Sequence, residues 1–124
     1  VEICTGAECP PCVAVDLAFD GLLKAYKPAD VILMQYHVHI PGPDPLTNPD
    51  SEARFKYYRD TFPEAIRGAP STVFDGKPAA GGGGAMAAAE KKYLAYRAVI
   101  DPLLETPAGA RLRVKASIAP FVAP

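Results

Sequence analysis

The sequence contains no tryptophan, only three cysteines and no long apolar run. Three cysteines are too few to staple a small secreted domain through several disulfides. A membrane-spanning helix would need about 18 consecutive apolar residues, and no such stretch occurs. The 13 basic and 14 acidic residues give a net charge of −1 and form no basic run. We therefore expect neither a membrane span nor nucleic acid as a partner.

What the sequence does contain is typical of one globular domain. Of its 124 residues, 49% are hydrophobic and 22% are charged, and this length is enough to bury one sizeable core. The 14 prolines occur mostly in short groups, which indicates punctuation between elements rather than disorder. The chain starts at Val1 without an initiator methionine, so we expect a mature or trimmed chain that has lost any leader.

The first 39 residues predict a strand, a helix and a second strand. Residues 1–5 predict a short strand, and the continuous apolar run at 31–39 predicts a strand covered on both faces. Between them, residues 13–26 carry an apolar stripe at helical spacing. Its members are Val15, Phe19, Leu22, Leu23 and Tyr26. Pro28 ends this helix. The two strands are expected to lie parallel in one right-handed unit.

A proline-rich segment separates this unit from the next helix. Residues 40–49 hold four prolines and predict an irregular loop, which is either a rim that contacts substrate or a rigid spacer. A helix is expected over 49–62, with Asn48 as its N-cap. Its inward-facing residues are expected to be Phe55, Tyr58 and Phe62.

Two strands and a long helix are predicted after that. Asp75-Gly76 is a strong two-residue hairpin signal, so antiparallel strands are expected at 71–74 and 77–80. The glycine run 81–84 allows close backbone approach. Residues 86–104 then predict a helix. Its inward-facing residues are expected to be Ala89, Tyr93, Tyr96, Ile100 and Leu103.

The motif that carries chemistry is Cys9-Pro10-Pro11-Cys12, at the start of the first predicted helix. Two thiols at this spacing are close enough to form a small disulfide ring. The unpaired N–H groups and the positive end of a helix favour a thiolate, which is the form that attacks disulfides. Proline suits early helix positions and stiffens the turn. We therefore expect Cys9 to be an exposed nucleophile and Cys12 to be the resolving thiol.

A second motif lies at 66–77, where the sequence reads Ile-Arg-Gly-Ala-Pro-Ser-Thr-Val-Phe-Asp-Gly-Lys. Together with the CxxC motif and the order of elements, this segment resembles the thioredoxin superfamily over roughly residues 1–105. The resemblance implies an α/β fold in which a mixed sheet is flanked by helices on both faces. It also implies a cis bond before Pro70, facing the dithiol, and backbone hydrogen bonds from Ala69 to a bound substrate.

A closer resemblance is to secreted bacterial thioredoxin-like proteins of poorly defined function, through Glu2-Ile3-Cys4-Thr5 and Tyr36-His37. Such proteins often continue into a β-rich region. Residues 110–118 alternate charged and apolar side chains and predict a strand that would open this region. We therefore expect a thioredoxin-like domain over 1–107 and a tail over 108–124. The resemblance also implies export to the periplasm or the extracellular side, with a cytoplasmic location left open.

The chain departs from thioredoxins on both sides of the motif. Glu8 stands where thioredoxins have tryptophan, and Ile3 stands where they have a buried acid. The Glu8 carboxylate opposes ionisation of the Cys9 thiol by like-charge repulsion, so the helix is expected to activate this thiol only modestly. Cys4, on the first strand, is expected to be a buried small hydrophobe.

The first interpretation of the motif is thiol–disulfide exchange with protein substrates, supported by a redox partner and without a cofactor. Cys9 and Cys12 would be catalytic. The residues expected to contact substrate are Ala69, Pro70, Pro10 and Pro11. His37 and Glu8 are accessory candidates because they lie near the dithiol. A His at a strand end is also often hydrogen-bonded to the following loop, and this alternative for His37 stays open.

Two other interpretations stay open. Cys9 and Cys12 can form half of a copper or zinc site, completed by His37 and His39, which share one face of a strand near its end. Alternatively, the two cysteines form a structural disulfide in an interaction module without turnover.

Overall fold

The computed structural model describes residues 1–110 and 113–117, and within them the chain forms a four-stranded mixed sheet with three α-helices. The elements follow in the order β1 (Glu2–Thr5), α1 (Val13–Ala25), β2 (Met34–His37), α2 (Pro49–Thr61), β3 (Ser71–Phe74), β4 (Lys77–Pro78) and α3 (Ala89–Glu105). Short 3₁₀ helices, η1 (Pro10–Cys12) and η2 (Met86–Ala88), precede α1 and α3. The predicted α/β class is confirmed.

The strands lie in the order β2-β1-β3-β4. β1 runs parallel to β2, with Thr5 opposite His37, and antiparallel to β3, with Cys4 opposite Ser71. The predicted parallel unit and the antiparallel β3–β4 hairpin are both confirmed. Because β1 pairs with both neighbours, the carboxyl ends of β1 and β2 and the amino end of β3 lie together at one end of the strands.

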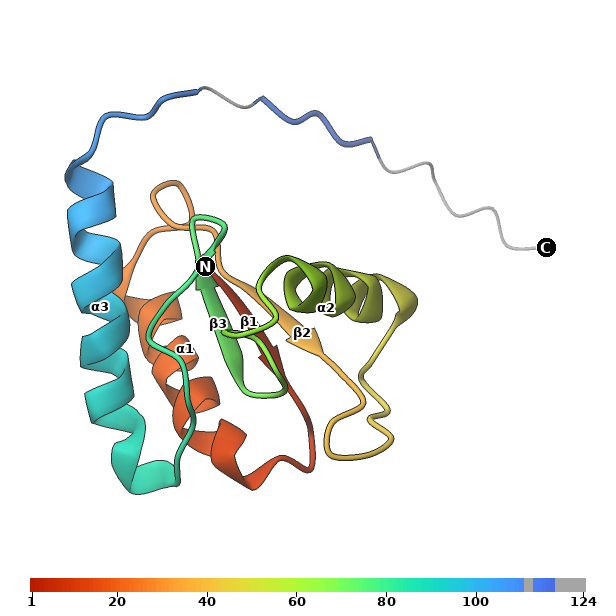
Figure 1. Cartoon of the computed structure of the whole chain (residues 1–124). Helices are drawn as coiled ribbons and strands as arrows, with labels where there is room; N and C mark the ends of the chain where they lie inside the picture. Colours follow the sequence, from red (N-terminus) through yellow and green to blue (C-terminus); the bar gives the residue numbers. More distant parts are fainter. Residues whose placement is uncertain (111–112, 118–124) are drawn as a thin grey trace.

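Helices cover both faces of this sheet, with α1 and α3 on one face and α2 on the other (Figure 1). Successive residues of a strand point to opposite faces. Accordingly, Ile3 packs in one core cluster with residues of α1 and α3, whereas Cys4 packs in a second cluster with residues of α2. The short strand β1 therefore contributes to two cores at once.

Local sequence signals set several boundaries as predicted. Asn48 caps α2, because its side chain accepts a hydrogen bond from the Ser51 N–H at 2.9 Å. Asp75 and Gly76 form the hairpin turn with positive φ angles of 48° and 77°, which glycine and aspartate tolerate in this kind of turn.

The predicted strand over 31–39 is wrong in its length and burial. β2 has four residues and lies at the edge of the sheet, so that Met34 is 45% exposed. An apolar run indicates that a segment is hydrophobic, but it does not indicate whether the strand is central or at the edge of the sheet. The burial predicted for residues 31–39 is therefore too high. The strand predicted over 77–80 likewise shortens to the two residues of β4.

Two leucines predicted to face inward are exposed. Leu23 is 54% exposed although Leu22 is fully buried, because the two are separated by about 100° around the helix axis. Leu103, in the last turn of α3, is 43% exposed, beyond the buried part of the helix at Tyr96 and Ile100. The buried stripe is therefore narrower than the apolar stripe of the sequence.

The described part of the tail carries no strand. Residues 110 and 113–117 have no regular structure and are exposed, so the strand predicted over 110–118 is wrong for them. Residues 111–112 and 118–124 lie outside the described residues, and the tail over 108–124 stays a prediction. Among the described residues, no helix has the length and apolar character needed to cross a membrane.

A polar cluster joins β1 to α2. Arg54 donates to Glu2 through Nε at 2.7 Å and through Nη2 at 2.8 Å, and the Tyr58 hydroxyl donates to Glu2 Oε1 at 2.5 Å. Burial alone would raise the pKa of Glu2, but these hydrogen bonds outweigh burial and lower the pKa. The cluster therefore fixes α2 against β1 through an ionised carboxylate.

We predict that Arg54→Met lowers the free energy of unfolding by about 1–2 kcal/mol at pH 7, because the Glu2 carboxylate loses its ion pair. The pKa of Glu2 is lowered in the fold, so this stabilisation is complete above the unfolded value of about 4.3 and is lost as the pH falls. The difference from the wild type should therefore shrink below pH about 4. Urea unfolding at pH 7 and pH 3 measures both effects.

Lys56→Met is the matched control on the same helix. It breaks only the exposed Lys56–Asp60 pair, and we expect a change below about 0.5 kcal/mol. An equal loss in both variants, or a loss in Arg54→Met that does not depend on pH, contradicts the role given to the cluster.

Candidate active site at the Cys9–Cys12 disulfide

The two cysteines of the CxxC motif lie together at the start of α1. A disulfide joins Cys9 to Cys12 across η1, and their Cα atoms are 5.3 Å apart. Cys12 directly precedes α1 and already has helical backbone angles. The disulfide ring therefore lies at the end of the helix where backbone N–H groups lack helical partners. The predicted position of the pair is confirmed.

Cys9 is less accessible than predicted. Its exposed fraction is 7%, against 0% for Cys12. The Cys9 sulfur lies 3.9 Å from the carbonyl oxygen of Ala69, so the segment before β3 covers part of it. The expectation of an openly exposed nucleophile is wrong, although Cys9 is still the more accessible of the two cysteines.

Ala69 and Pro70 lie across from the dithiol turn. The peptide bond between them is cis, as the resemblance implies. Both residues are half-buried and lead into β3, whose antiparallel pairing brings them to the end of β1 from which the CxxC motif departs. Pro10 and Pro11, the other residues predicted to contact substrate, are exposed on the turn itself.

Two glycines of the predicted close-approach run hold the helix side of the turn. The Gly84 N–H donates to the Pro11 carbonyl at 2.7 Å, and the Ala14 N–H donates to the Gly84 carbonyl at 3.0 Å. An alanine Cβ at Gly83 would lie 2.0 Å from the Pro11 oxygen and 2.7 Å from Pro70 Cγ. The predicted close approach is confirmed, and its partners are the dithiol turn and Pro70.

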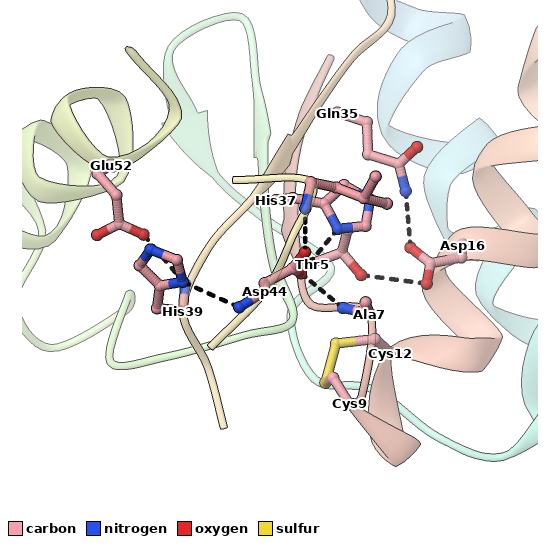
Figure 2. A network of polar contacts seen from close by, with 11 residues as sticks. Thr5, Ala7, Cys9, Cys12, Asp16, Gln35, His37, His39, Asp44 and Glu52 are labelled. Atoms are coloured by element: carbon pink, nitrogen blue, oxygen red, sulfur yellow. Dashed lines mark hydrogen bonds and ion pairs between the residues drawn. A yellow bond between two sulfur atoms is a disulfide. The ribbon is translucent and has the colours of Figure 1, made fainter. Parts of the chain in front are cut away.

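A buried carboxylate from the proline-rich loop holds the other side of the turn. Asp44 is 5% exposed and accepts hydrogen bonds from the Ala7 N–H at 2.7 Å, the Leu46 N–H at 2.8 Å and His37 Nδ1 at 2.9 Å (Figure 2). Burial alone would raise the pKa of Asp44, but the hydrogen bonds outweigh burial and lower the pKa to about 2. An ionised carboxylate only accepts, so His37 carries a proton on Nδ1.

Both histidines of the second strand region contact Asp44. The Asp44 N–H donates to His39 Nδ1 at 3.0 Å, so this nitrogen carries no proton. The backbone N–H of His39 donates to Glu52 Oε1 at 3.0 Å. The alternative in which His37 is hydrogen-bonded to the loop that follows its strand is confirmed.

The metal interpretation needs Cys9, Cys12, His37 and His39 to converge, and the structure does not bring them together. Over residues 1–110 and 113–117, no group of three or more His, Cys, Asp or Glu side chains is placed to hold a metal ion. Both histidines instead turn Nδ1 towards Asp44 (Figure 2). The four-residue site is therefore wrong, because these four side chains do not converge on one point in the described part of the chain.

Asp16 is a second acid of this region that the sequence analysis did not single out. It lies four residues after Cys12 in α1 and accepts hydrogen bonds from Thr5 Oγ1 at 3.1 Å and Gln35 Nε2 at 3.0 Å (Figure 2). Burial raises its pKa. The sequence could have indicated Asp16, because residues four apart in a helix lie on the same side of it, and Asp16 therefore follows Cys12 on one side of the helix. Glu8, the predicted accessory acid, is exposed next to Cys9 in the chain.

Cys4 is buried, as predicted for a small hydrophobe. It is 3% exposed, and burial raises the pKa of its thiol to about 12.

We predict that iodoacetamide at pH 8 labels Cys9 of the reduced folded protein fastest, Cys12 more slowly and Cys4 not at all. Peptide mass mapping measures this, with labelling in urea as the control for all three. Rapid labelling of Cys4 in the folded protein contradicts the assignment.

We predict that Gly83→Ala lowers the free energy of unfolding by about 1–3 kcal/mol, because its Cβ meets the Pro11 carbonyl, a backbone group that is not free to yield. Gly81→Ala is the matched control. Nothing lies within 4 Å of a Cβ at Gly81, so this change should stay within about 0.5 kcal/mol of the wild type or stabilise slightly. Urea unfolding of the oxidised proteins compares them, and equal effects argue against the close contact.

Comparisons of the chain with family models, curated proteins and solved structures find no match.

Proposed function

We propose that this chain is a thioredoxin-like thiol–disulfide oxidoreductase that exchanges disulfides with protein substrates through Cys9 and Cys12. One observation carries the proposal: the disulfide lies at the N-terminus of α1 with the Ala69 carbonyl 3.9 Å from the Cys9 sulfur. The disulfide closes a loop with a sequence separation of only 3, and short loops restrict the unfolded chain least. Redox chemistry therefore explains the pair better than stabilisation does.

The reaction follows from the order of accessibility of the two sulfurs. In the reducing direction, the Cys9 thiolate attacks a substrate disulfide, a mixed disulfide forms, and the leaving substrate thiolate takes up a proton. Cys12 then loses its proton and attacks the Cys9 sulfur, and the second substrate thiolate leaves and is protonated. Two electrons pass to the substrate, so a redox partner must reduce the Cys9–Cys12 disulfide again. Oxidation of substrate thiols uses the same steps in reverse.

The N-terminal end of α1 supports the thiolate that this reaction needs. Backbone N–H groups at a helix start lack acceptors, and the helix dipole places positive charge there. Cys9 directly precedes η1, the 3₁₀ turn that leads into α1, and it is the more accessible of the two cysteines. A nucleophile at Cys9 and a resolving thiol at the fully buried Cys12 follow from this difference.

A bound substrate would lie along the segment that faces the disulfide. The half-buried Ala69 offers its backbone beside the Cys9 sulfur, as the end of a strand does for an added strand. Pro70 borders this segment, and Pro10 and Pro11 border the turn on its exposed side. These residues supply shape and main-chain hydrogen bonds, which suits protein substrates of varied sequence.

The thioredoxin-like assignment draws its support from the order of elements together with the two motifs. A strand, the CxxC motif, a helix, a parallel strand, a helix and an antiparallel hairpin follow in the order that the resemblance implies. We extend the proposal to an exported protein, acting in the periplasm or on the extracellular side, where disulfides persist.

We predict that the protein catalyses the reduction of insulin by dithiothreitol, and that Cys9→Ser abolishes this activity. Cys12→Ser should form the mixed disulfide but not release it, so a covalent adduct with a peptide thiol accumulates and is seen by mass spectrometry. Cys4→Ser is the matched control and should keep turnover, because Cys4 lies away from the reaction in the core.

Two results would reject the proposal: no turnover by the wild type, or full turnover by Cys9→Ser. A Cys9–Cys12 disulfide that stays intact in mild reductant would instead favour the interaction module without turnover.

A further inference from the structure

The exchange reaction proposed above gives Asp44 no role, yet its carboxylate is buried and paired beside the dithiol turn. An aspartate that only shapes its own loop needs partners within that loop, such as the Leu46 N–H. Two donors to Asp44 come from elsewhere in the chain: the Ala7 N–H, two residues before Cys9, and His37 Nδ1. Asp44 therefore joins the segment that leads into the CxxC motif to loop 40–49.

Loop 40–49 touches the same segment at a second point. A Cβ on Gly6 would lie 2.1 Å from the Ile40 carbonyl oxygen, so the two backbones are in direct contact. The Cys9 N–H donates to the Gly6 carbonyl at 3.2 Å. The chain therefore contacts loop 40–49 at two successive residues, Gly6 and Ala7, shortly before the nucleophile Cys9.

We propose that Asp44 is a positioning residue for the dithiol: it fastens the segment that carries Cys9 to loop 40–49 and thereby keeps Cys9 close to Cys12. This rests on the proposed function, in which these two thiols react. On the helix side of the CxxC turn, the Gly84 N–H donates a hydrogen bond to the Pro11 carbonyl. A turn held at both ends keeps two thiols near each other, which raises the effective concentration of one for the other and favours the disulfide.

Asparagine is a sharp probe of this role. The three groups that face the Asp44 carboxylate are all donors, so either orientation of an asparagine amide sets its NH₂ against a donor. Asp44→Asn thus keeps the size of the side chain and breaks at least one contact. Asp50→Ala is the matched control, because it removes the same charge from an exposed position in the first turn of α2.

The measurement is the equilibrium between the protein disulfide with two glutathione molecules and the protein dithiol with glutathione disulfide. Acid quenching, alkylation and mass spectrometry give the effective concentration of the Cys9–Cys12 pair. We expect Asp44→Asn and Asp44→Ala to lower it by about tenfold, and Asp50→Ala to change it by less than about twofold. A purely structural role for Asp44 would lower resistance to urea and leave this constant unchanged, and that result overturns the proposal.

A second measurement uses the wild type, in case the variants do not fold. Ala7 is exposed, so its amide should exchange hydrogen with solvent rapidly unless the Asp44 carboxylate holds it. We expect protection of the Ala7 amide in both the oxidised and the reduced protein. Rapid exchange in the reduced protein overturns the proposal, because Asp44 would then not hold the thiol segment when the disulfide forms.

These tests are separate from the test of the proposed function, because they need no protein substrate. If the wild type fails on insulin while the Asp44 variants still shift the glutathione equilibrium, exchange with proteins is rejected and the positioning role of Asp44 is supported. If insulin is reduced, but the Asp44 variants keep the glutathione equilibrium of the wild type and the Ala7 amide exchanges rapidly, only the role of Asp44 is rejected.

Discussion

The pairing of β1 with strands on both of its sides is the constraint on which the site depends. The parallel partner β2 ends opposite the end of β1, with His37 beside Thr5, whereas the antiparallel partner β3 begins there. The CxxC turn, the loop after β2 and the segment containing Ala69 therefore leave the sheet at the same edge. β1 is kept in place because Ile3 and Cys4 enter different cores, so that displacing the strand would expose apolar surface on both faces.

Much of this arrangement could be predicted from the sequence because its signals are local. The Asn48 cap, the Asp75-Gly76 turn and the helical stripes each depend on a few neighbouring residues. The structure has the cap, the turn and the helices, although the buried stripes are narrower than the apolar ones. The burial of β2 could not be predicted in the same way. Exposure of Met34 depends on the absence of a further strand beyond β2 among the described residues, and no local pattern encodes that.

The contacts that hold the dithiol could not be found from the sequence for a related reason. Asp44 pairs with the Ala7 N–H across 37 positions of the chain, and Gly84 pairs with the carbonyl of Pro11. In both cases one partner is a backbone group, which every residue other than proline offers as donor and every residue offers as acceptor. Residue identity therefore says nothing about the partner. The sequence shows that Asp44 lies in a proline-rich loop and that residues 81–84 are glycines, but it does not show which groups they contact.

The surrounding charges bear on how reactive such a dithiol can be. Glu8, Asp16 and Asp44 all lie near the disulfide in sequence or space, and their negative charges oppose a thiolate. Counting acids overstates this opposition, because Asp44 shares its charge among three donors and Glu8 is exposed to water, which screens it. Asp16 is partly buried, and burial raises the pKa of its carboxyl group, so it is neutralised more readily than an ordinary aspartate. The field of the helix end therefore acts against a weaker opposition than the composition suggests, and a nucleophile at Cys9 is compatible with this acidic setting.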